Sequence, residues 1–459
     1  MRYILIILSL FLFSFTIISC GEEPFFKIDT SDNITTTNDT NTNDSGSDDS
    51  SDNSTGTSDN SSTTTDTTAP TVTSVSTTAD NQSSVAITDN ITVTFSEAMD
   101  TTSVTTNTDN TSCYGTLGVS SDNFSSCVQM SSSSPASSSD NMTFTLYPSD
   151  NLTVGTTYLT RVTTGVKDVA GNALSSQYET SSGFRTLGTF VAAGDSGKIY
   201  TSTDKGTTWT SRTSGVSKGL RAVAFGNNTF VTSGDDGTIL TASDNGVTWT
   251  SRTSGVSTHL QGGTFGNEVF VIVGASGTII TSSDNGTTWD SRTSGTSEVI
   301  WEVTYDNNIF VSVSDNGSIY TSDNGTTWTA RNSGTSNPLR GVTYGNSIFV
   351  VVGNSGTVLT SSDGTTWISR TSGVSTDLQE VTFGNNTYVA VGDSNTIITS
   401  SDGSAWTSRT GTGHLEEVTF GDDTFVTVGG SGVPTSSDNG TTWVVRTLSG
   451  TFYGLSFSE

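Results

Sequence analysis

The chain has 459 residues, with 17 Lys and Arg against 45 Asp and Glu, so its formal net charge is −28 at pH 7. Such a charge argues against nucleic acid as a partner, because binding to phosphates depends on Lys and Arg. A largely helical fold is also excluded, since 48 Gly and many Ser, Thr, Asn and Asp residues favour turns and strands.

The N-terminus predicts a lipoprotein signal peptide over residues 1–19. Arg2 precedes an apolar run over residues 4–18, which spans only about 22 Å as a helix and is too short to cross a membrane stably. Residues 17–20, Ile-Ile-Ser-Cys, resemble a bacterial lipobox. This resemblance implies a lipid anchor on Cys20. With Gly21 next, it implies the outer membrane, facing the periplasm or the cell surface. An ordinary secretory signal with an accidental Cys is the alternative.

Residues 20–68 are predicted to form a disordered tether behind the lipidated Cys. From Asp29 to Asp66 the chain consists almost entirely of Ser, Thr, Asn, Asp and Gly. Such a segment buries too little apolar surface to offset the entropy lost on ordering.

Cys113 and Cys127 are the two remaining cysteines, and the loop between them lacks the paired Cys and His ligands of a zinc site. An even pair in an exported protein predicts a disulfide, which stabilises such a loop by about 3 kcal/mol in the chain-entropy model. Free thiols are the alternative.

Residues 69–187 are predicted to form an all-β sandwich. Residues 71–75, 91–95, 143–147 and 158–162 alternate β-branched or aromatic with polar residues. The segments Pro70-Thr-Val, Val93-Thr-Phe-Ser-Glu-Ala-Met-Asp and Val166-Lys-Asp-Val-Ala-Gly-Asn-Ala-Leu resemble the bacterial Ig-like domain of the S-layer (SbsA) type. That resemblance implies a spacer or adhesive module.

Residues 188–459 contain an internal repeat, which Trp residues mark at intervals of about 40 residues. Each Trp ends a motif of the form Ser-x-Asp-x-Gly-x-x-Trp, with some copies one residue shorter. This motif resembles the Asp-box (BNR repeat) of sialidase-like and photosystem II assembly-factor-like β-propellers. Seven copies at the period of a propeller blade predict a seven-bladed propeller. The Asp and Trp pairs are Asp204 and Trp209, Asp244 and Trp249, Asp284 and Trp289, Asp323 and Trp328, Asp363 and Trp367, Asp402 and Trp406, and Asp438 and Trp443.

The repeat begins and ends at different points of its four-strand unit. In one unit the predicted strands are residues 380–383, 387–391, 396–399 and 406–409. The region opens on a second strand at residues 189–193 and ends on a first strand at 454–457. The C-terminal strand is therefore predicted to complete the first blade and close the ring.

The Asp-boxes are predicted to be structural. The Asp carboxylate accepts backbone N–H groups in a turn, the Gly supplies a positive φ and the Trp ring packs into the blade. One carboxylate per turn is too few for Ca²⁺, so no metal and no cofactor are predicted. The seven Arg that follow the Trp by three residues recur at one equivalent position. They are therefore predicted to be structural rather than a substrate-binding cluster.

The predicted function is non-enzymatic binding of a protein or glycan ligand. No Ser, Cys, zinc or nucleotide motif of an enzyme is present. The first alternative is a carbohydrate-active, sialidase-like hydrolase. It would use as its catalytic pair two of the three residues Glu302, Glu380 and Glu417, which occupy equivalent positions near the axis. The second is an assembly or stability factor that docks on a membrane protein complex. The candidate binding face, where the repeats differ, consists of Arg221, His259, Trp301, Glu302, Arg340, Glu380, His414, Glu417 and Tyr453.

Overall fold

A computed structural model describes residues 65–77, 85–411, 413–430 and 432–458. The predicted signal peptide over residues 1–19, the lipid site at Cys20 and residues 20–64 of the predicted tether lie outside these described residues. In the described part of the chain, no helix is long and apolar enough to cross a membrane. The only helical elements there are short 3-10 turns, which confirms the all-β class.

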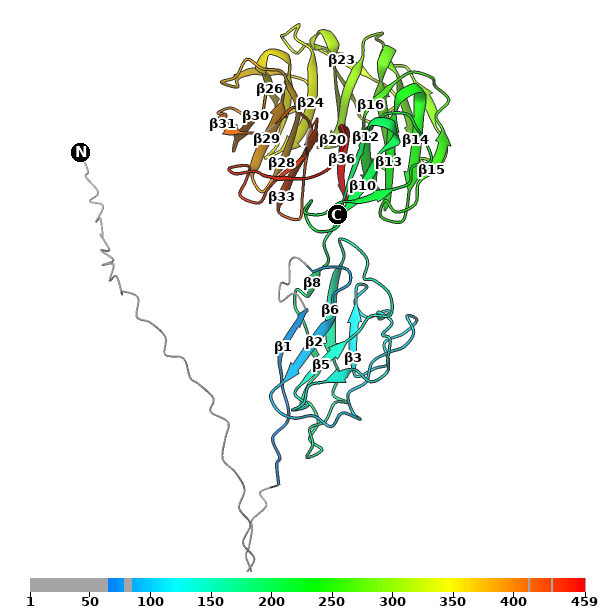
Figure 1. The fold of residues 1–459 in the computed structure, drawn as a ribbon, viewed down its shortest axis with the longest axis vertical. Coiled ribbons are helices and arrows are strands. Elements are labelled where there is room, and N and C mark those ends of the chain that lie inside the picture. Colours follow the sequence, from blue (N-terminus) through cyan, green and yellow to red (C-terminus); the bar gives the residue numbers. More distant parts are fainter. Residues whose placement is uncertain (1–64, 78–84, 412, 431, 459) are drawn as a thin grey trace, which may run out of the picture. The chain divides into compact units, whose positions relative to one another are not determined.

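The Ig-like domain consists of two antiparallel sheets (Figure 1). The first sheet has the order β1-β2-β5-β4. In the second sheet β6 lies between β3 and β7, and β8 also pairs with β6. The bounds are β1 (Val72–Thr77), β2 (Ile91–Phe95), β3 (Leu117–Ser120), β4 (Ala136–Ser137), β5 (Thr143–Leu146), β6 (Thr157–Val162), β7 (Tyr178–Glu179) and β8 (Phe184–Arg185).

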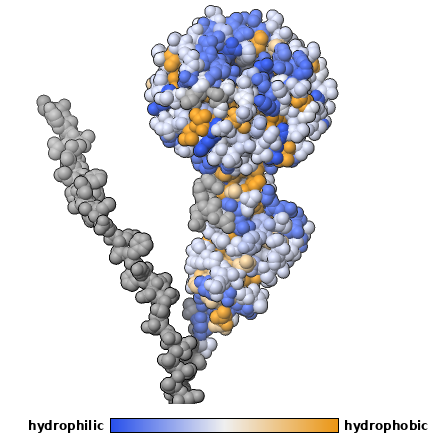
Figure 2. Space-filling view, viewed as in Figure 1, coloured by the Kyte–Doolittle hydropathy of each residue, from blue (hydrophilic) through white to orange (hydrophobic). Residues whose placement is uncertain are grey.

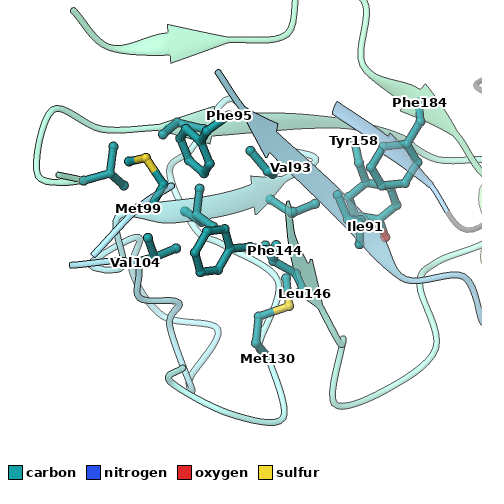
Figure 3. Close-up of a cluster of buried hydrophobic side chains, with 14 of the residues drawn as sticks. Ile91, Val93, Phe95, Met99, Val104, Met130, Phe144, Leu146, Tyr158 and Phe184 are labelled. Carbon is teal, nitrogen blue, oxygen red and sulfur yellow. The ribbon is translucent and has the colours of Figure 1, made fainter. Parts of the chain in front are cut away.

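The core of the Ig-like domain is made by apolar side chains from both sheets (Figure 3). Val93 and Phe95 of β2 and Phe144 of β5 are buried, as is Tyr158 of β6. The rings of Phe95 and Phe144 meet edge to face, with centroids 5.8 Å apart. The alternating patterns at residues 71–75, 91–95, 143–147 and 158–162 therefore mark the strands β1, β2, β5 and β6.

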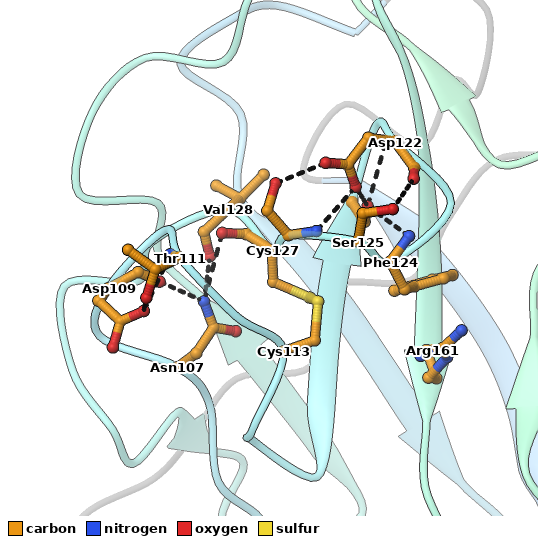
Figure 4. Close-up of a disulfide and its surroundings, with 12 residues drawn as sticks. Asn107, Asp109, Thr111, Cys113, Asp122, Phe124, Ser125, Cys127, Val128 and Arg161 are labelled. Atoms are coloured by element: carbon orange, nitrogen blue, oxygen red, sulfur yellow. Dashed lines mark hydrogen bonds between the residues drawn. A yellow bond between two sulfur atoms is a disulfide. The ribbon is translucent and has the colours of Figure 1, made fainter.

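A disulfide links Cys113 and Cys127, as the sequence predicts (Figure 4). Between the two cysteines, Asp122 accepts hydrogen bonds from the hydroxyl groups of Ser120, at 2.7 Å, and Ser126, at 2.6 Å. These hydrogen bonds lower the pKa of Asp122 to about 2. The carboxylate therefore stays ionised and holds the turn together at any physiological pH.

The repeat region forms seven four-stranded antiparallel sheets, the propeller. Each sheet runs from an innermost to an outermost strand. In the first three sheets the strands, in this order, are β36 (Phe452–Ser458), β9 (Thr189–Gly194), β10 (Ile199–Ser202) and β11 (Thr210–Arg212); β12 (Leu220–Gly226), β13 (Thr229–Gly234), β14 (Thr238–Ala242) and β15 (Thr250–Thr253); and β16 (Leu260–Gly266), β17 (Val269–Gly274), β18 (Ile279–Ser282) and β19 (Asp290–Arg292).

The other four sheets repeat this arrangement. Their strands are β20 (Ile300–Asp306), β21 (Ile309–Ser314), β22 (Ile319–Ser322) and β23 (Thr329–Arg331); β24 (Leu339–Gly345), β25 (Ile348–Gly353), β26 (Thr357–Ser361) and β27 (Ile368–Thr371); β28 (Leu378–Gly384), β29 (Thr387–Gly392), β30 (Thr396–Ser400) and β31 (Thr407–Thr410); and β32 (Leu415–Gly421), β33 (Thr424–Gly429), β34 (Val433–Ser436) and β35 (Val444–Arg446).

The C-terminal strand β36 pairs with β9, the first strand of the repeat region. Innermost strands of neighbouring sheets contact one another in order, and β36 contacts both β12 and β32. In Figure 1 β12, β20 and β36 lie in the middle of the propeller, and β15 and β31 lie at its periphery. Phe190 of β9 and Phe452 of β36 pack with Val426 and Val428 of β33, which joins the first sheet to the last.

Short 3-10 turns follow the second strand in five of the sheets. Each turn has a central residue with φ between 55° and 57°, which lets the chain reverse direction within three residues. The turns are η1 (Asp195–Gly197), η2 (Asp235–Gly237), η3 (Ala275–Gly277), η4 (Asp315–Gly317) and η5 (Asn354–Gly356).

The turns that the sequence predicts to be Asp-boxes are held together by hydrogen bonds of the expected kind. Ser202 donates to Asp204 at 2.8 Å, and Asp204 accepts the backbone N–H of Thr208 at 2.9 Å. The indole N–H of Trp209 donates to the carbonyl oxygen of Gly206 at 3.0 Å. The same indole bond to a Gly carbonyl occurs in all seven turns.

One Asp-box assignment needs correction. The sequence predicts Asp323 as the acceptor of the fourth turn, but in the structure the acceptor is Asn324. The side-chain oxygen of Asn324 accepts hydrogen bonds from Ser322, at 3.2 Å, and from the backbone N–H of Thr326, at 2.9 Å. This turn is one residue shorter between the Ser and the Trp, so the acceptor lies directly before the Gly, as Asp363 does in the next turn.

The recurrent Arg residues lie on the outermost strands, away from the axis. Six of them donate through Nε to a Thr hydroxyl on the neighbouring strand, with N–O distances of 2.8–2.9 Å. These are Arg212, Arg252, Arg292, Arg331, Arg370 and Arg409. They are structural, and they form no common substrate site.

Candidate functional site

Each innermost strand of the propeller contains an irregularity near its start. The pairing register shifts there by one residue, for example between Ile300 and Glu302 of β20. Such a β-bulge lets two consecutive side chains face the same side, which a regular strand does not. In every sheet the bulge therefore places two consecutive side chains at one end of the propeller axis. We call the first of the two the rim residue and the second the inner residue.

The rim and inner positions surround a cavity of about 320 Å³. The seven rim residues all line it, and they are of five different types. They are Tyr453, Arg221, Gln261, Trp301, Arg340, Gln379 and Glu416. The inner positions are small in four sheets and carry Glu in the other three. They are Gly454, Ala222, Gly262, Glu302, Gly341, Glu380 and Glu417.

Several rim side chains are held in place from the outside. In four sheets the rim side chain donates a hydrogen bond to the side chain of the residue fourteen positions later. That residue is the first of the turn after the second strand. A rim held in this way loses little conformational freedom when a ligand binds. The pairs are Arg221 with Asp235 at 2.7 Å, Trp301 with Asp315 at 2.8 Å, Arg340 with Asn354 at 3.1 Å, and Gln379 with Asp393 at 2.8 Å.

The two rim Arg residues also stack on rim aromatic rings from the neighbouring sheets. The guanidinium carbon of Arg340 lies 4.0 Å from the Trp301 ring centroid, and that of Arg221 lies 4.9 Å from the Tyr453 ring centroid. Cation–π attraction and the bonds from Nε fix each guanidinium plane. The rim therefore presents two oriented cation–aromatic pairs to a ligand.

The two histidines of the predicted binding face do not line the cavity. His414 lies one step away, with Nε2 2.6 Å from Glu416 and Nδ1 2.9 Å from Asp393. His259 Nδ1 lies 3.1 Å from the carboxylate of Asp235. Both histidines therefore contact the partners of rim residues and position the rim from outside.

Glu302, Glu380 and Glu417 form the floor of the cavity, the glutamate cluster. One carboxylate oxygen from each lies within 4.8 Å of the others, a spacing that could hold a cation. Two glycines of neighbouring sheets lie close to two of these carboxylates. A Cβ on Gly341 would lie 2.6 Å from the Glu380 carboxylate, and one on Gly262 would lie 2.8 Å from that of Glu302.

The glutamate cluster titrates at unusually high pH. Burial raises the pKa of Glu302 to about 8, although hydrogen bonds from the backbone N–H groups of Val303 and Gly263 act in the opposite direction. Burial and the charges of Glu417 and Glu302 raise the pKa of Glu380 well above its ordinary value. Burial and the charge of Glu302 do the same for Glu417. Glu302 therefore holds its proton at neutral pH.

A second cavity of about 200 Å³ lies on the other side of the glutamate cluster. Its lining includes the three Glu. Two residues further along the innermost strands it also includes Thr304, Thr343 and other Thr residues. The glutamate cluster thus lies between two polar cavities along the axis.

The visible surface offers no competing apolar site. Figure 2 shows hydrophobic residues scattered over that face rather than gathered into one broad patch. The exposed large hydrophobic residues of the propeller are few and dispersed. Val247 lies in a turn, Ile368 on the outermost strand β27, and Val444 and Val445 on the outermost strand β35 of another sheet. The axial cavity is therefore the strongest candidate for a site.

The structure brings seven of the nine predicted binding-face residues to this cavity. These are Arg221, Trp301, Glu302, Arg340, Glu380, Glu417 and Tyr453. Gln261, Gln379 and Glu416 complete the rim; they are not among the nine candidates, although they lie in the same variable segments before the innermost strands. A signal for these three existed, because each precedes an inner position in the repeat as Arg221 does.

Two protein-family descriptions match parts of the sequence. Residues 66–186 match a bacterial Ig-like domain, and residues 170–299 match the DUF6242 beta propeller domain. These matches and the strand pairing establish an Ig-like domain followed by a propeller. No curated protein matches the chain.

Solved structures that align with part of this chain include the following three. YCF48 bound to D1 peptide is 19% identical over 50% of this chain and 80% of its own, with a TM-score of 0.42. The computationally designed Ika8 protein is 16% identical over 59% of this chain and 87% of its own, with a TM-score of 0.46. The WD40 beta propeller domain of Doa1 is 12% identical over 52% of this chain and 85% of its own, with a TM-score of 0.44.

Proposed function

We propose that this chain is a non-enzymatic, lipid-anchored binding protein of the bacterial outer membrane. The Ig-like domain acts as a spacer, and the axial cavity of the propeller binds a protein or glycan ligand. The anchor rests on the lipobox-like residues 17–20. Its test is Cys20→Ser, which should move the protein from the membrane fraction to the soluble fraction. A variant that stays in the membrane fraction would contradict the anchor.

One observation carries the binding site. At a single equivalent position the seven sheets supply Arg, Gln, Trp, Arg, Gln, Glu and Tyr, while the strands around this position repeat. Structural needs are the same in every sheet, so they do not explain this variety. A cavity with a few fixed polar and aromatic groups is the usual form of a ligand site.

The experiment is a screen of the purified full chain on glycan and peptide arrays, followed by titration of each ligand found. Arg340→Ala removes a fixed guanidinium from the rim and should weaken binding at least tenfold. The matched control is Arg370→Ala, which changes the same residue type on an outermost strand. Equal loss of binding in both variants, or in neither, would contradict the axial site.

The glutamate cluster favours a second candidate function, a glycoside hydrolase. Such enzymes pair a protonated carboxylic acid with an ionised carboxylate, and the high pKa of Glu302 suits the acid. The test is hydrolysis of a panel of fluorogenic glycosides by the full chain. Turnover that Glu302→Gln and Glu380→Gln abolish would replace the binding function with an enzymatic one.

A further inference from the structure

The three carboxyl groups of the glutamate cluster have no cationic partner in the described part of the chain. No Lys, Arg or His forms an ion pair with Glu302, Glu380 or Glu417 there. Glu380 is only 7% exposed, and it lines the cavity. Burying a carboxyl group without a counter-ion lowers stability, and such features persist mainly at functional sites.

The fold itself does not require these glutamates. Four of the seven sheets have Gly or Ala at the same position and pair in the same register. Gly262 and Gly341 lie close against the innermost strand of the next sheet: a Cβ on Gly262 would overlap the carbonyl oxygen of Trp301, and one on Gly341 would lie 2.8 Å from the Cα of Glu380. Gly454 approaches Ala222 in the same way, so these glycines reflect close strand packing and do not depend on the carboxylates.

We propose that the cavity binds a cationic side chain of a polypeptide, a Lys ammonium or an Arg guanidinium, which enters along the axis and ends among the carboxylates of the glutamate cluster. This inference rests on the proposed function and names the partner: a basic segment of another protein. A bare metal ion would need only the carboxylates, whereas the cavity of about 320 Å³ above them leaves room for a side chain.

The rest of the molecule suits such a partner. A chain with a net charge of −28 attracts basic segments over a distance and speeds their encounter. At the rim, Gln261 and Gln379 offer amide groups to a peptide backbone. The rim guanidinium groups are already paired, Arg221 with Asp235 and Arg340 with the Trp301 ring.

Binding should release protons. Burial raises the pKa of all three carboxyl groups, that of Glu302 to about 8, and an entering cation favours their ionised form. The other charged or titratable side chains on the cavity are Arg221, Arg340, Glu416 and Tyr453. For each proton released, the association constant should rise by up to tenfold per pH unit until the cluster is ionised.

Isothermal titration calorimetry of the full chain tests this inference. The cationic probes are N-acetyl-lysine methylamide and N-acetyl-arginine methylamide, and the uncharged control is N-acetyl-norleucine methylamide. At least one cationic probe should saturate with an affinity ten or more times that of the norleucine control. Its affinity should increase from pH 6.5 to 9, and the heat should depend on the ionisation enthalpy of the buffer.

Variants show whether the glutamate cluster is the site. The triple variant Glu302→Gln, Glu380→Gln, Glu417→Gln keeps the side-chain shapes and should lose the probe. Glu380→Gln alone should weaken it at least tenfold and serves if the triple variant does not fold. Glu268→Gln is the control, because Glu268 is exposed and lies in the turn between β16 and β17.

The outcomes separate this inference from the proposed function. Unchanged probe binding in the Gln variants overturns the inference, as does equal binding of the norleucine control. Saturable binding of CaCl₂ without any binding of the cationic probes overturns it in favour of a metal site. An array ligand that depends on Arg340 but not on the three Glu also overturns it, yet leaves the proposed function intact.

Discussion

Glu302→Gln removes one ionisable group from the glutamate cluster while keeping the shape of the side chain. The folded state holds a proton on Glu302 up to a pKa of about 8, whereas the unfolded chain loses it near 4.5. The folded state therefore binds more protons between these values, and this group lowers the stability as pH rises through that window. Gln has no such dependence.

The size of the effect follows from the two pKa values. A difference of this size corresponds to on the order of 5 kcal/mol between pH 4.5 and 8. Glu302 is partly exposed to the cavity, so solvent screening reduces this to about 2–3 kcal/mol. The melting temperature of the variant should then exceed that of the parent by roughly 5–10 °C at pH 9 and match it at pH 5.

Tryptophan fluorescence during heating measures this effect. All 8 Trp residues of the chain lie in the propeller and none in the Ig-like domain, so the signal reports on the propeller alone. Glu268→Gln, an exposed change outside the cavity, should leave the melting temperature unchanged at both pH values. A Glu302→Gln variant that melts with the parent at pH 5 and also at pH 9 would refute the reasoning.

Three further predictions concern the scaffold. Deleting β36 (Phe452–Ser458) removes the buried side chains of Phe452 and Leu455, at a cost of about 1.5–3 kcal/mol each, and leaves the inner edge of β9 without a partner strand. We expect aggregation or a large fall in melting temperature. A deletion variant that melts like the full chain would contradict the closed ring. Cys113→Ser with Cys127→Ser should lower the stability of the Ig-like domain by about 3 kcal/mol in urea, while the propeller signal stays unchanged. Asp284→Ala should lower the melting temperature more than Asp284→Asn, because Asn324 already fills this position in another turn; equal effects would argue against the hydrogen-bonding role.

Much of this architecture could be predicted from the sequence. The Asp-box period marks each sheet, and the alternating patterns at residues 91–95 and 387–391 locate β2 and β29. Where the pattern is weak, prediction fails. β3 (Leu117–Ser120) contains Gly and Ser, is buried throughout and shows no alternation, while β4, β7 and β8 have only two residues each.

The candidate site was predictable in position but not in detail. In a regular strand Glu416 and Glu417 would face opposite sides, so only one of them would be expected at the axis. The bulge before Glu417 turns both toward the cavity. A bulge leaves no clear mark in the sequence, because it depends on pairing with the next strand.

The most direct test of the axial site is hydrogen–deuterium exchange of the full chain with and without the tightest ligand from the arrays. Protection should appear at the starts of the innermost strands, such as Leu220–Arg221 and Leu339–Arg340, and in the turns η2, η4 and η5 that support the rim. Protection confined to the Asp-box turns or to the Ig-like domain, with no change at the innermost strands, would contradict the account.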